Sequence, residues 1–156
     1  MDKSLLLQKL EAENIEGFDA SSSAPKPAGN YVAVKRVGNL AYVSGQMSVH
    51  SSGKVLAGTN NIDIEFGYKA AKLAMANALK QLLYFDDINE VLSIVRVDGC
   101  FIHNNGKDIP KMLDGASDLV ANILKGKSGE HARTVFGVKT LPYDAFAKVV
   151  VIAEIK

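Results

Sequence analysis

The alternation of apolar and polar positions predicts a short helix followed by a β-rich segment. Residues 4–13 place three leucines on one face of a helix and put lysine and glutamate elsewhere. A loop rich in serine and proline follows over residues 21–29. Residues 31–36 alternate as a strand does, and Gly38-Asn39 is a turn signal before a second strand over residues 40–43. These two strands are expected to form a hairpin, and residues 54–57 form either a third strand or an extended loop.

The second half of the chain alternates between long helices and strands. Residues 63–83 carry helical spacing, with Asp63 and Glu65 at the end where the helix dipole favours negative charge. A β-rich run follows over residues 90–102, in which Gly99 is a candidate bulge. Pro110 suits the first turn of a second long helix, which extends to about residue 124, and two final strands cover residues 133–138 and 148–155. The stripe of the second helix expected to be buried consists of Leu113, Ala116, Ser117, Val120 and Leu124.

This order of elements predicts one α+β domain built on a mixed sheet. Hairpins at both ends and helices between the central strands place both long helices on one face of the sheet. Several strand residues on the other face are apolar, so a second copy of the chain is expected to cover them. The 156 residues are the size of one ordinary domain, in which residues 1–20 add an N-terminal helix.

Charge and composition narrow the classes of partner. Eighteen basic residues face seventeen acidic ones, and 47% of the chain is hydrophobic. The chain has no tryptophan and shows neither a basic stripe nor a cluster of aromatic residues, which argues against nucleic acid as a partner. The first apolar run covers only residues 5–7, too short for a signal peptide or a membrane span. A cytoplasmic location without membrane association is therefore expected.

Common catalytic and metal-binding motifs are absent from the sequence. It contains no Walker A loop, GxGxxG, HExxH, GxSxG or EF-hand pattern. Cys100 is the single cysteine, which excludes an internal disulfide and a cysteine-rich zinc site. Its place within a strand pattern predicts a small buried hydrophobe.

The histidines and the paired aspartates are weaker candidates. His50, His103 and His131 lie far apart in sequence and lack the spacing of metal ligands, so we predict surface or loop histidines. One alternative is a site that combines His103 and His131 with Asp108. The carboxylates at positions 86 and 87 are expected to be solvated in a polar loop.

Arg133 and the segment Ser44-Gly45-Gln46 are the stronger candidates for a ligand site. Arg133 begins a predicted strand directly after a polar loop, and its planar guanidinium matches a carboxylate with two parallel hydrogen bonds. The alternative is a surface arginine paired with an acidic residue. Gly45 ends a predicted strand, where the missing side chain lets backbone N–H groups approach a ligand. The alternative there is an ordinary turn.

Three short runs resemble one protein family. Residues 38–46 (GNLAYVSGQ) resemble the GNLVFTSGQ segment of the reactive intermediate deaminase family, also called YjgF-like or L-PSP endoribonuclease. Residues 132–135 (ARTV), followed by Leu141-Pro142, resemble its ARS-V…LP signature. Residues 115–119 (GASDL) are similar to a longer-chain subfamily, and the resemblance covers residues 31–154.

This resemblance implies a fold, an assembly and an activity. The fold is similar to that of chorismate mutase, a mixed sheet with two helices on one face. Three copies form a homotrimer around a central barrel, and ligands bind in the clefts between neighbouring copies. The activity is hydrolysis of reactive enamines and imines to 2-keto acids and ammonia without metal or organic cofactor, and the ligand is a small-molecule carboxylate.

The resemblance also assigns roles to individual residues. Arg133 matches the arginine that holds the substrate carboxylate. Deaminating members place a glutamate six residues after the proline of the LP pair, and Lys148 occupies that position here. Arg133 and Lys148 are thus the residues assigned to the reacting centre, where the lysine adds positive charge but cannot act as a carboxylate base. The other residues matched to the binding site are Val135, Ser44, Gly45, Tyr31 and Asp114.

Three functions follow from these residues. The first is an enzyme that hydrolyses imino acids held by Arg133. The second, favoured by Lys148, is a protein that binds or senses small carboxylates without converting them. The third, cleavage of RNA, is the least favoured because the chain lacks a basic stripe.

Overall fold

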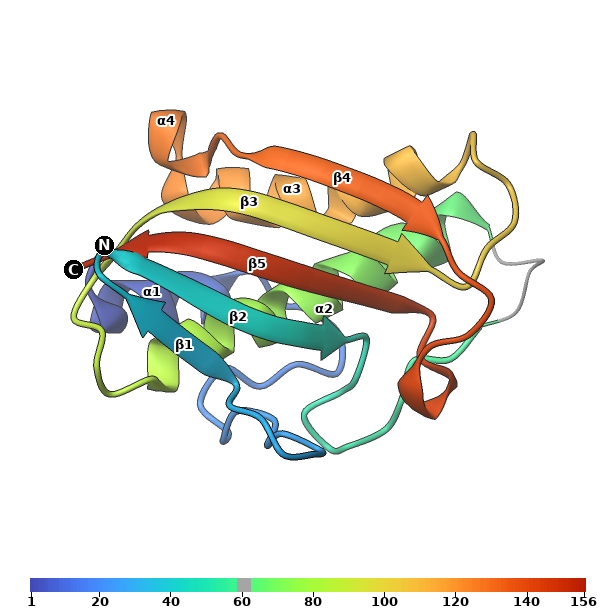
Figure 1. Ribbon diagram of the computed structural model, residues 1–156. Coiled ribbons are helices and arrows are strands. Elements are labelled where there is room, and N and C mark those ends of the chain that lie inside the picture. The colour runs from blue at the N-terminus through green and yellow to red at the C-terminus, as the bar shows by residue number, and fades with distance from the viewer. Residues whose placement is uncertain (59–62) are drawn as a thin grey trace.

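The computed structural model describes residues 1–58 and 63–156, which form a five-stranded mixed sheet (Figure 1). The strands lie side by side in the order β1-β2-β5-β3-β4. All neighbours are antiparallel except β3 and β4, which are parallel. Their bounds are β1 Val34–Val37, β2 Leu40–Met47, β3 Val91–Phe101, β4 Ala132–Gly137 and β5 Ala147–Ile155.

The two long helices lie behind one face of the sheet, as predicted (Figure 1). Alternate residues of β5 are buried beneath them, so the core lies between the sheet and the helices. The opposite side, which we call the open face, carries Tyr42, Phe136 and Val150, each at least 36% exposed. The helices are α1 Lys3–Ala12, α2 Ile64–Tyr84, α3 Ile109–Leu124 and α4 Gly126–Gly129, with a 3₁₀ turn η1 over Pro142–Asp144.

Local sequence signals explain where the long helices begin. The side chain of Asp63 caps α2 by accepting a hydrogen bond from the backbone N–H of Phe66 at 2.8 Å. Pro110 lies in the first turn of α3, where its missing N–H is tolerated. The many alanines of α2 let this helix pack closely against both the sheet and the neighbouring α3.

The N-terminal segment packs into the same helical layer. Leu6 and Leu10 of α1 are buried in the core. Lys80 of α2 is only 1% exposed, and its ammonium donates hydrogen bonds to the Asp19 carbonyl oxygen at 2.5 Å and to Ser22 Oγ at 2.6 Å. Burial lowers the pKa of Lys80, and the nearby Asp19 carboxylate acts in the opposite direction. Lys80 therefore fastens residues 19–22 to α2.

The predicted C-terminal hairpin is wrong. Strands β4 and β5 do not pair, because β5 enters the middle of the sheet between β2 and β3. β4 instead runs parallel to β3 at the edge, where most of its residues are exposed. β5 is almost wholly buried or half-buried along its length, as a central strand must be. We expected consecutive strands to pair, but the chain crosses from the edge strand β4 to the central position of β5.

Two local expectations change, and one open alternative is decided. Tyr31 does not begin a strand, because its N–H bonds to the Gly29 carbonyl oxygen in a turn and β1 starts at Val34. Residues 54–57 form the extended loop rather than a third strand, with only isolated β-bridges to Val49 and Ala145. Gly99 lies in regular register with both adjacent strands rather than in a bulge. A Cβ there would overlap the side chain of Leu113, so the glycine makes room for α3.

Candidate functional site

Arg133 leaves the edge strand β4 and reaches α3. Its Nη1 donates to Asp114 Oδ1 at 2.8 Å and to Ser117 Oγ at 3.0 Å, and its Nη2 donates to the Pro110 carbonyl oxygen at 3.2 Å. A guanidinium has five N–H donors, so two remain without a partner in the described part of the chain. The side chain is 30% exposed. Arg133 is thus paired with an aspartate and still offers two donors, enough for one carboxylate.

Ser117 and His131 complete this group, which we call the Arg133 cluster (Arg133, Asp114, Ser117 and His131). His131 Nδ1 lies 3.0 Å from the carbonyl oxygen of Gly129. A carbonyl only accepts, so Nδ1 carries the proton of the neutral ring. Nε2 then accepts from the Ser117 hydroxyl at 2.9 Å. Ser117 accepts from Arg133 and donates to His131 at the same time.

Ser117 and His131 were not among the predicted site residues. Ser117 was expected in the buried stripe of α3, yet it is only half-buried and faces β4. The signal lay in the spacing, because Ser117 is three residues from Asp114 on the helix and His131 is two residues from Arg133. Such spacings place side chains on one side of their element. Val135 follows Arg133 by the same spacing along β4 and is half-buried.

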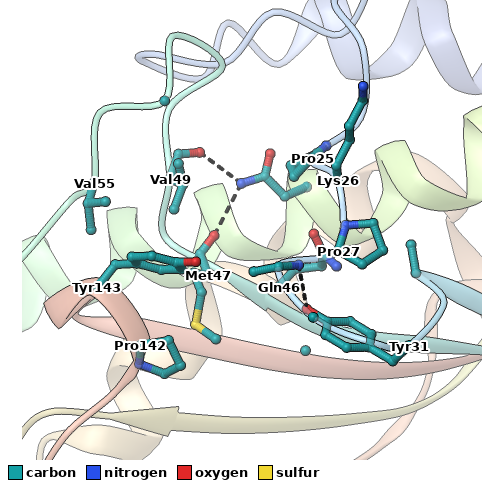
Figure 2. Close-up of a pocket in the computed structure, with 16 residues that line it drawn as sticks. Pro25, Lys26, Pro27, Tyr31, Gln46, Met47, Val49, Val55, Pro142 and Tyr143 are labelled. Carbon is teal, nitrogen blue, oxygen red and sulfur yellow. Dashed lines mark hydrogen bonds between the residues drawn. The ribbon is translucent and has the colours of Figure 1, made fainter.

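A second group of predicted site residues lies at the other edge of the sheet. Tyr31 and Gly45 line a pocket of about 520 Å³ between the loop over residues 25–29, the end of β2 and η1 (Figure 2). Ser44 lies beside it and donates from Oγ to the Val32 carbonyl oxygen at 2.7 Å. Pro142 and Tyr143 border the pocket from the side of η1.

The turn that carries Tyr143 is strained. Tyr143 and Asp144 have φ values of 60° and 57°, a region that residues with side chains rarely adopt. The result is that Tyr143 stands 68% exposed beside the pocket, facing the side on which Tyr31 lies (Figure 2). Consecutive strained residues are typical of functional surfaces.

Asn77 holds the wall of this pocket through two hydrogen bonds. Its Nδ2 donates to the Met47 carbonyl oxygen at 3.1 Å and to the Val49 carbonyl oxygen at 2.8 Å, as the dashed lines in Figure 2 mark. Asn77→Leu should lower the free energy of unfolding by about 1–3 kcal/mol, because the Val49 carbonyl loses its donor. Urea unfolding would measure the loss. The same change at the exposed Asn89 is the control, and equal effects at both positions would contradict the assigned role.

Lys148 lies against the second group rather than beside Arg133. A Cβ added to Gly45 would come within 2.9 Å of Lys148 Cδ, so the aliphatic part of the lysine runs along that glycine. Cys100 is opposite Lys148 in the register of β3 and β5. Burial raises the pKa of the Cys100 thiol, and the charge of Lys148 acts in the opposite direction. Cys100 is buried, as predicted.

Within one chain, the Arg133 cluster lies apart from the second group, which contains Tyr31 and Gly45. Between β2 and β4 lie β5 and β3, so the two strands are about 14 Å apart at the usual strand spacing. Arg133 also points toward α3, whereas Lys148 alternates with the buried residues of β5 and faces the other side. The structure therefore groups Arg133 with Asp114 and Val135, and Lys148 with Gly45.

The histidines form no common site in the structure. His103 lies in the loop after β3, one of the two expected positions, but it is buried, and its Nε2 lies 3.0 Å from Asp108 Oδ2. His131 stands at the opposite end of the parallel pair β3 and β4. Within residues 1–58 and 63–156, no three His, Cys, Asp or Glu side chains are placed to hold a metal ion.

Among the helices of the described residues, none is both long and apolar enough to cross a bilayer.

Known proteins of similar sequence and structure identify the family. A curated relative, protein TCP17 of Trypanosoma cruzi, is 27% identical over 138 residues, which are 85% of this chain and 86% of the relative. The crystal structure of a putative endoribonuclease from Shewanella oneidensis MR-1 is 30% identical with a TM-score of 0.81, and the match covers 96% of this chain and 98% of that one. The structure of E. coli TdcF with bound serine shares the fold at 19% identity and a TM-score of 0.63, covering 84% and 92% of the two chains.

The match to the family extends over nearly the whole sheet and both long helices. The family described as YjgF/chorismate mutase-like, putative endoribonuclease, matches residues 15–155. The five-stranded mixed sheet with two long helices on one face agrees with that description. The chain therefore belongs to the YjgF/chorismate mutase-like family.

Proposed function

We propose that the protein binds a small carboxylate through Arg133 and hydrolyses reactive imino acids there to 2-keto acids and ammonia. The observation that carries this proposal is the pair of N–H donors that Arg133 retains beside its bonds to Asp114, Ser117 and Pro110. A carboxylate is the group that fits two such donors. E. coli TdcF, which shares the fold, was solved with bound serine, a molecule that carries a carboxylate.

The complete site is proposed to lie between copies of the chain. In a single chain two strands separate β4 from the end of β2, where Gly45 and Tyr31 line their pocket, too far for one small ligand to touch both groups. The Arg133 cluster is one half-site, and the pocket lined by Tyr31 and Gly45 is the other. If the β4 edge of one copy meets the β1–β2 edge of the next, each contact brings the two half-sites together. Head-to-tail contacts of this kind close into rings, and we propose a homotrimer whose open faces surround a central barrel.

Lys148 supports a second candidate function. A hydrolase must orient water with a group that accepts a proton, and a lysine ammonium only donates. With Lys148 beside Gly45, the second half-site is cationic where a deaminating relative has a carboxylate. The protein would then bind or sense a small carboxylate without converting it. Cleavage of RNA, which the family description names, is not favoured by a net charge of +1.

The first test is the rate of 2-iminobutyrate hydrolysis by the wild-type protein, with sedimentation to give the oligomeric state. We expect hydrolysis above buffer by a trimer. Lys148→Glu should raise the rate about tenfold or more, because the new carboxylate can orient water. Lys139→Glu, the same charge change at an exposed lysine away from Gly45, is the control.

The outcomes separate the candidates. Thermal stabilisation by 2-ketobutyrate without hydrolysis would favour the binding function. A monomer that is neither stabilised nor active would overturn the proposal.

A further inference from the structure

The pocket at the end of β2 is larger than the ethyl group of 2-iminobutyrate requires. Its volume of about 520 Å³ lies within the range of about 300–1,000 Å³ that is usual for sites enclosing a whole small molecule. Most of the residues around it are apolar or aromatic, as in such sites. Those that form its walls include Pro25, Pro27, Tyr31, Met47, Val55 and Tyr143 (Figure 2). The pocket can therefore take a bulky apolar group.

Two tyrosines lie on opposite sides of this pocket. Tyr143 is 68% exposed and Tyr31 is 52% exposed, so much of each side chain is left uncovered by the described part of the chain. Figure 2 shows Pro142 beside Tyr143, and Pro27 beside Tyr31. The rings of tyrosine and proline offer flat apolar surfaces, and an aromatic ring packs well against another aromatic ring. The shape of the pocket thus favours a flat aromatic group.

Hydrogen bonds hold the wall around Tyr31 in place without a ligand. Gln81 of α2 is buried, and its Nε2 donates to the Pro25 carbonyl oxygen at 2.6 Å. The Tyr31 hydroxyl oxygen accepts from the backbone N–H of Ala28 at 3.3 Å. Because the hydroxyl is bound to the loop, Tyr31 presents mainly its ring to a ligand. Walls that are ordered in advance bind a ligand without the entropic cost of ordering them.

The charge around the pocket suits an acid. Among the described residues that line it, none is an aspartate or a glutamate. Lys148 runs along Gly45, which belongs to the lining. An aromatic acid would therefore meet positive charge and no carboxylate in the pocket wall, which favours it over an aromatic cation.

We propose that this pocket selects imino acids with an aromatic side chain, such as the imine of phenylalanine. The inference rests on the proposed imine hydrolysis and names the substrate class of that site. The free donors of Arg133 are on Nε and Nη2, the edge of the guanidinium away from Nη1 and Ser117. A carboxylate bound there leaves the rest of the ligand to extend away from the Arg133 cluster. Where two copies meet, its phenyl ring lies between Tyr31 and Tyr143 of the neighbouring copy.

The test compares kcat/KM for the imine of phenylalanine and for 2-iminobutyrate, both generated in solution by an amino acid oxidase. The ratio should be about ten or more in the wild type, because the ring buries apolar surface that the ethyl group lacks. Tyr143→Ala should bring the ratio close to one, whereas Tyr143→Phe should keep most of it because the ring is retained. Tyr84→Ala removes an exposed tyrosine outside the pocket and is the control that should keep the wild-type ratio.

The failure of this inference and of the proposed function give different results. If the wild type hydrolyses 2-iminobutyrate as well as the imine of phenylalanine, or if Tyr143→Ala keeps the wild-type ratio, the inference is overturned and imine hydrolysis stands. If neither imine is hydrolysed, stronger thermal stabilisation by phenylpyruvate than by 2-ketobutyrate would support the pocket in a protein that only binds. Stabilisation by neither compound would overturn the inference together with the proposed function.

Discussion

Replacing Arg133 by alanine is expected to abolish the stabilisation that 2-ketobutyrate gives to the folded protein. Two charge-assisted hydrogen bonds disappear with the guanidinium, together worth about 3 kcal/mol or more, which corresponds to roughly a hundredfold loss of affinity. A ligand at 100 times its Kd raises the free energy of unfolding by about 2.7 kcal/mol. At the same concentration the Arg133→Ala variant should show almost none of this gain in a thermal unfolding experiment.

Two further variants separate charge from geometry. Arg133→Lys keeps a positive charge but loses the planar fork, so it should bind more weakly than the wild type. Asp114→Asn keeps the size and an acceptor oxygen near Arg133 Nη1 while it removes a competing negative charge. It should bind 2-ketobutyrate more tightly. An Arg133→Ala protein still stabilised like the wild type would place the ligand elsewhere.

The elements with strong local signals could be predicted from the sequence. Both long helices were expected within a residue of their bounds, because apolar spacing, the Asp63 cap and Pro110 are all local. The hairpin of β1 and β2 followed from Gly38-Asn39, and Gly38 does adopt a positive φ of 61°.

The strand order at the C-terminus could not be predicted in the same way. Which strand lies between which depends on contacts far apart in sequence, such as Val43 opposite Val151 and Val97 opposite the same residue. The turn residues between the two final strands do not distinguish a hairpin from a crossover. The apolar content of β5 was a hint, since a strand buried along its length belongs in the centre of a sheet.

The candidate site was predicted residue by residue but not in its arrangement. Arg133 was singled out for its chemistry, and the alternative of an ion pair with an acidic residue is also realised, because Asp114 binds it. His131 was set aside because the histidines lack the spacing of metal ligands, and its partner Ser117, which lies on another element, was expected in the core. The hydrogen bond between Ser117 on α3 and His131 before β4 is a tertiary contact. The spacing of residues within each element does not show that these two elements lie side by side.

Gly115→Ala should destabilise the protein by about 2–3 kcal/mol, although alanine is the better helix former by about 1 kcal/mol. Gly115 lies where α3 crosses α2, and a Cβ there would overlap the backbone carbonyl oxygen of Tyr68. Backbone cannot move aside as a side chain can, so the helices must separate. They are also held together by the Tyr68 hydroxyl, which donates to Asp118 at 2.7 Å. Urea unfolding would measure the loss of stability.

Gly67→Ala is the matched control, because it adds the same methyl group to α2 at the same helix pair. The three nearest atoms to its Cβ would be Met112 Cγ, Sδ and Cβ, the last at 2.9 Å; rotation of this buried side chain can move the first two but not the Cβ, so the change should destabilise the protein, though less than a clash with backbone does. Gly115 is also flanked on α3 by the cluster residues Asp114 and Ser117. A shift of α3 should therefore weaken 2-ketobutyrate binding in Gly115→Ala but not in Gly67→Ala. Equal stability and equal binding in the two variants would mean that α3 can move without disturbing the Arg133 cluster.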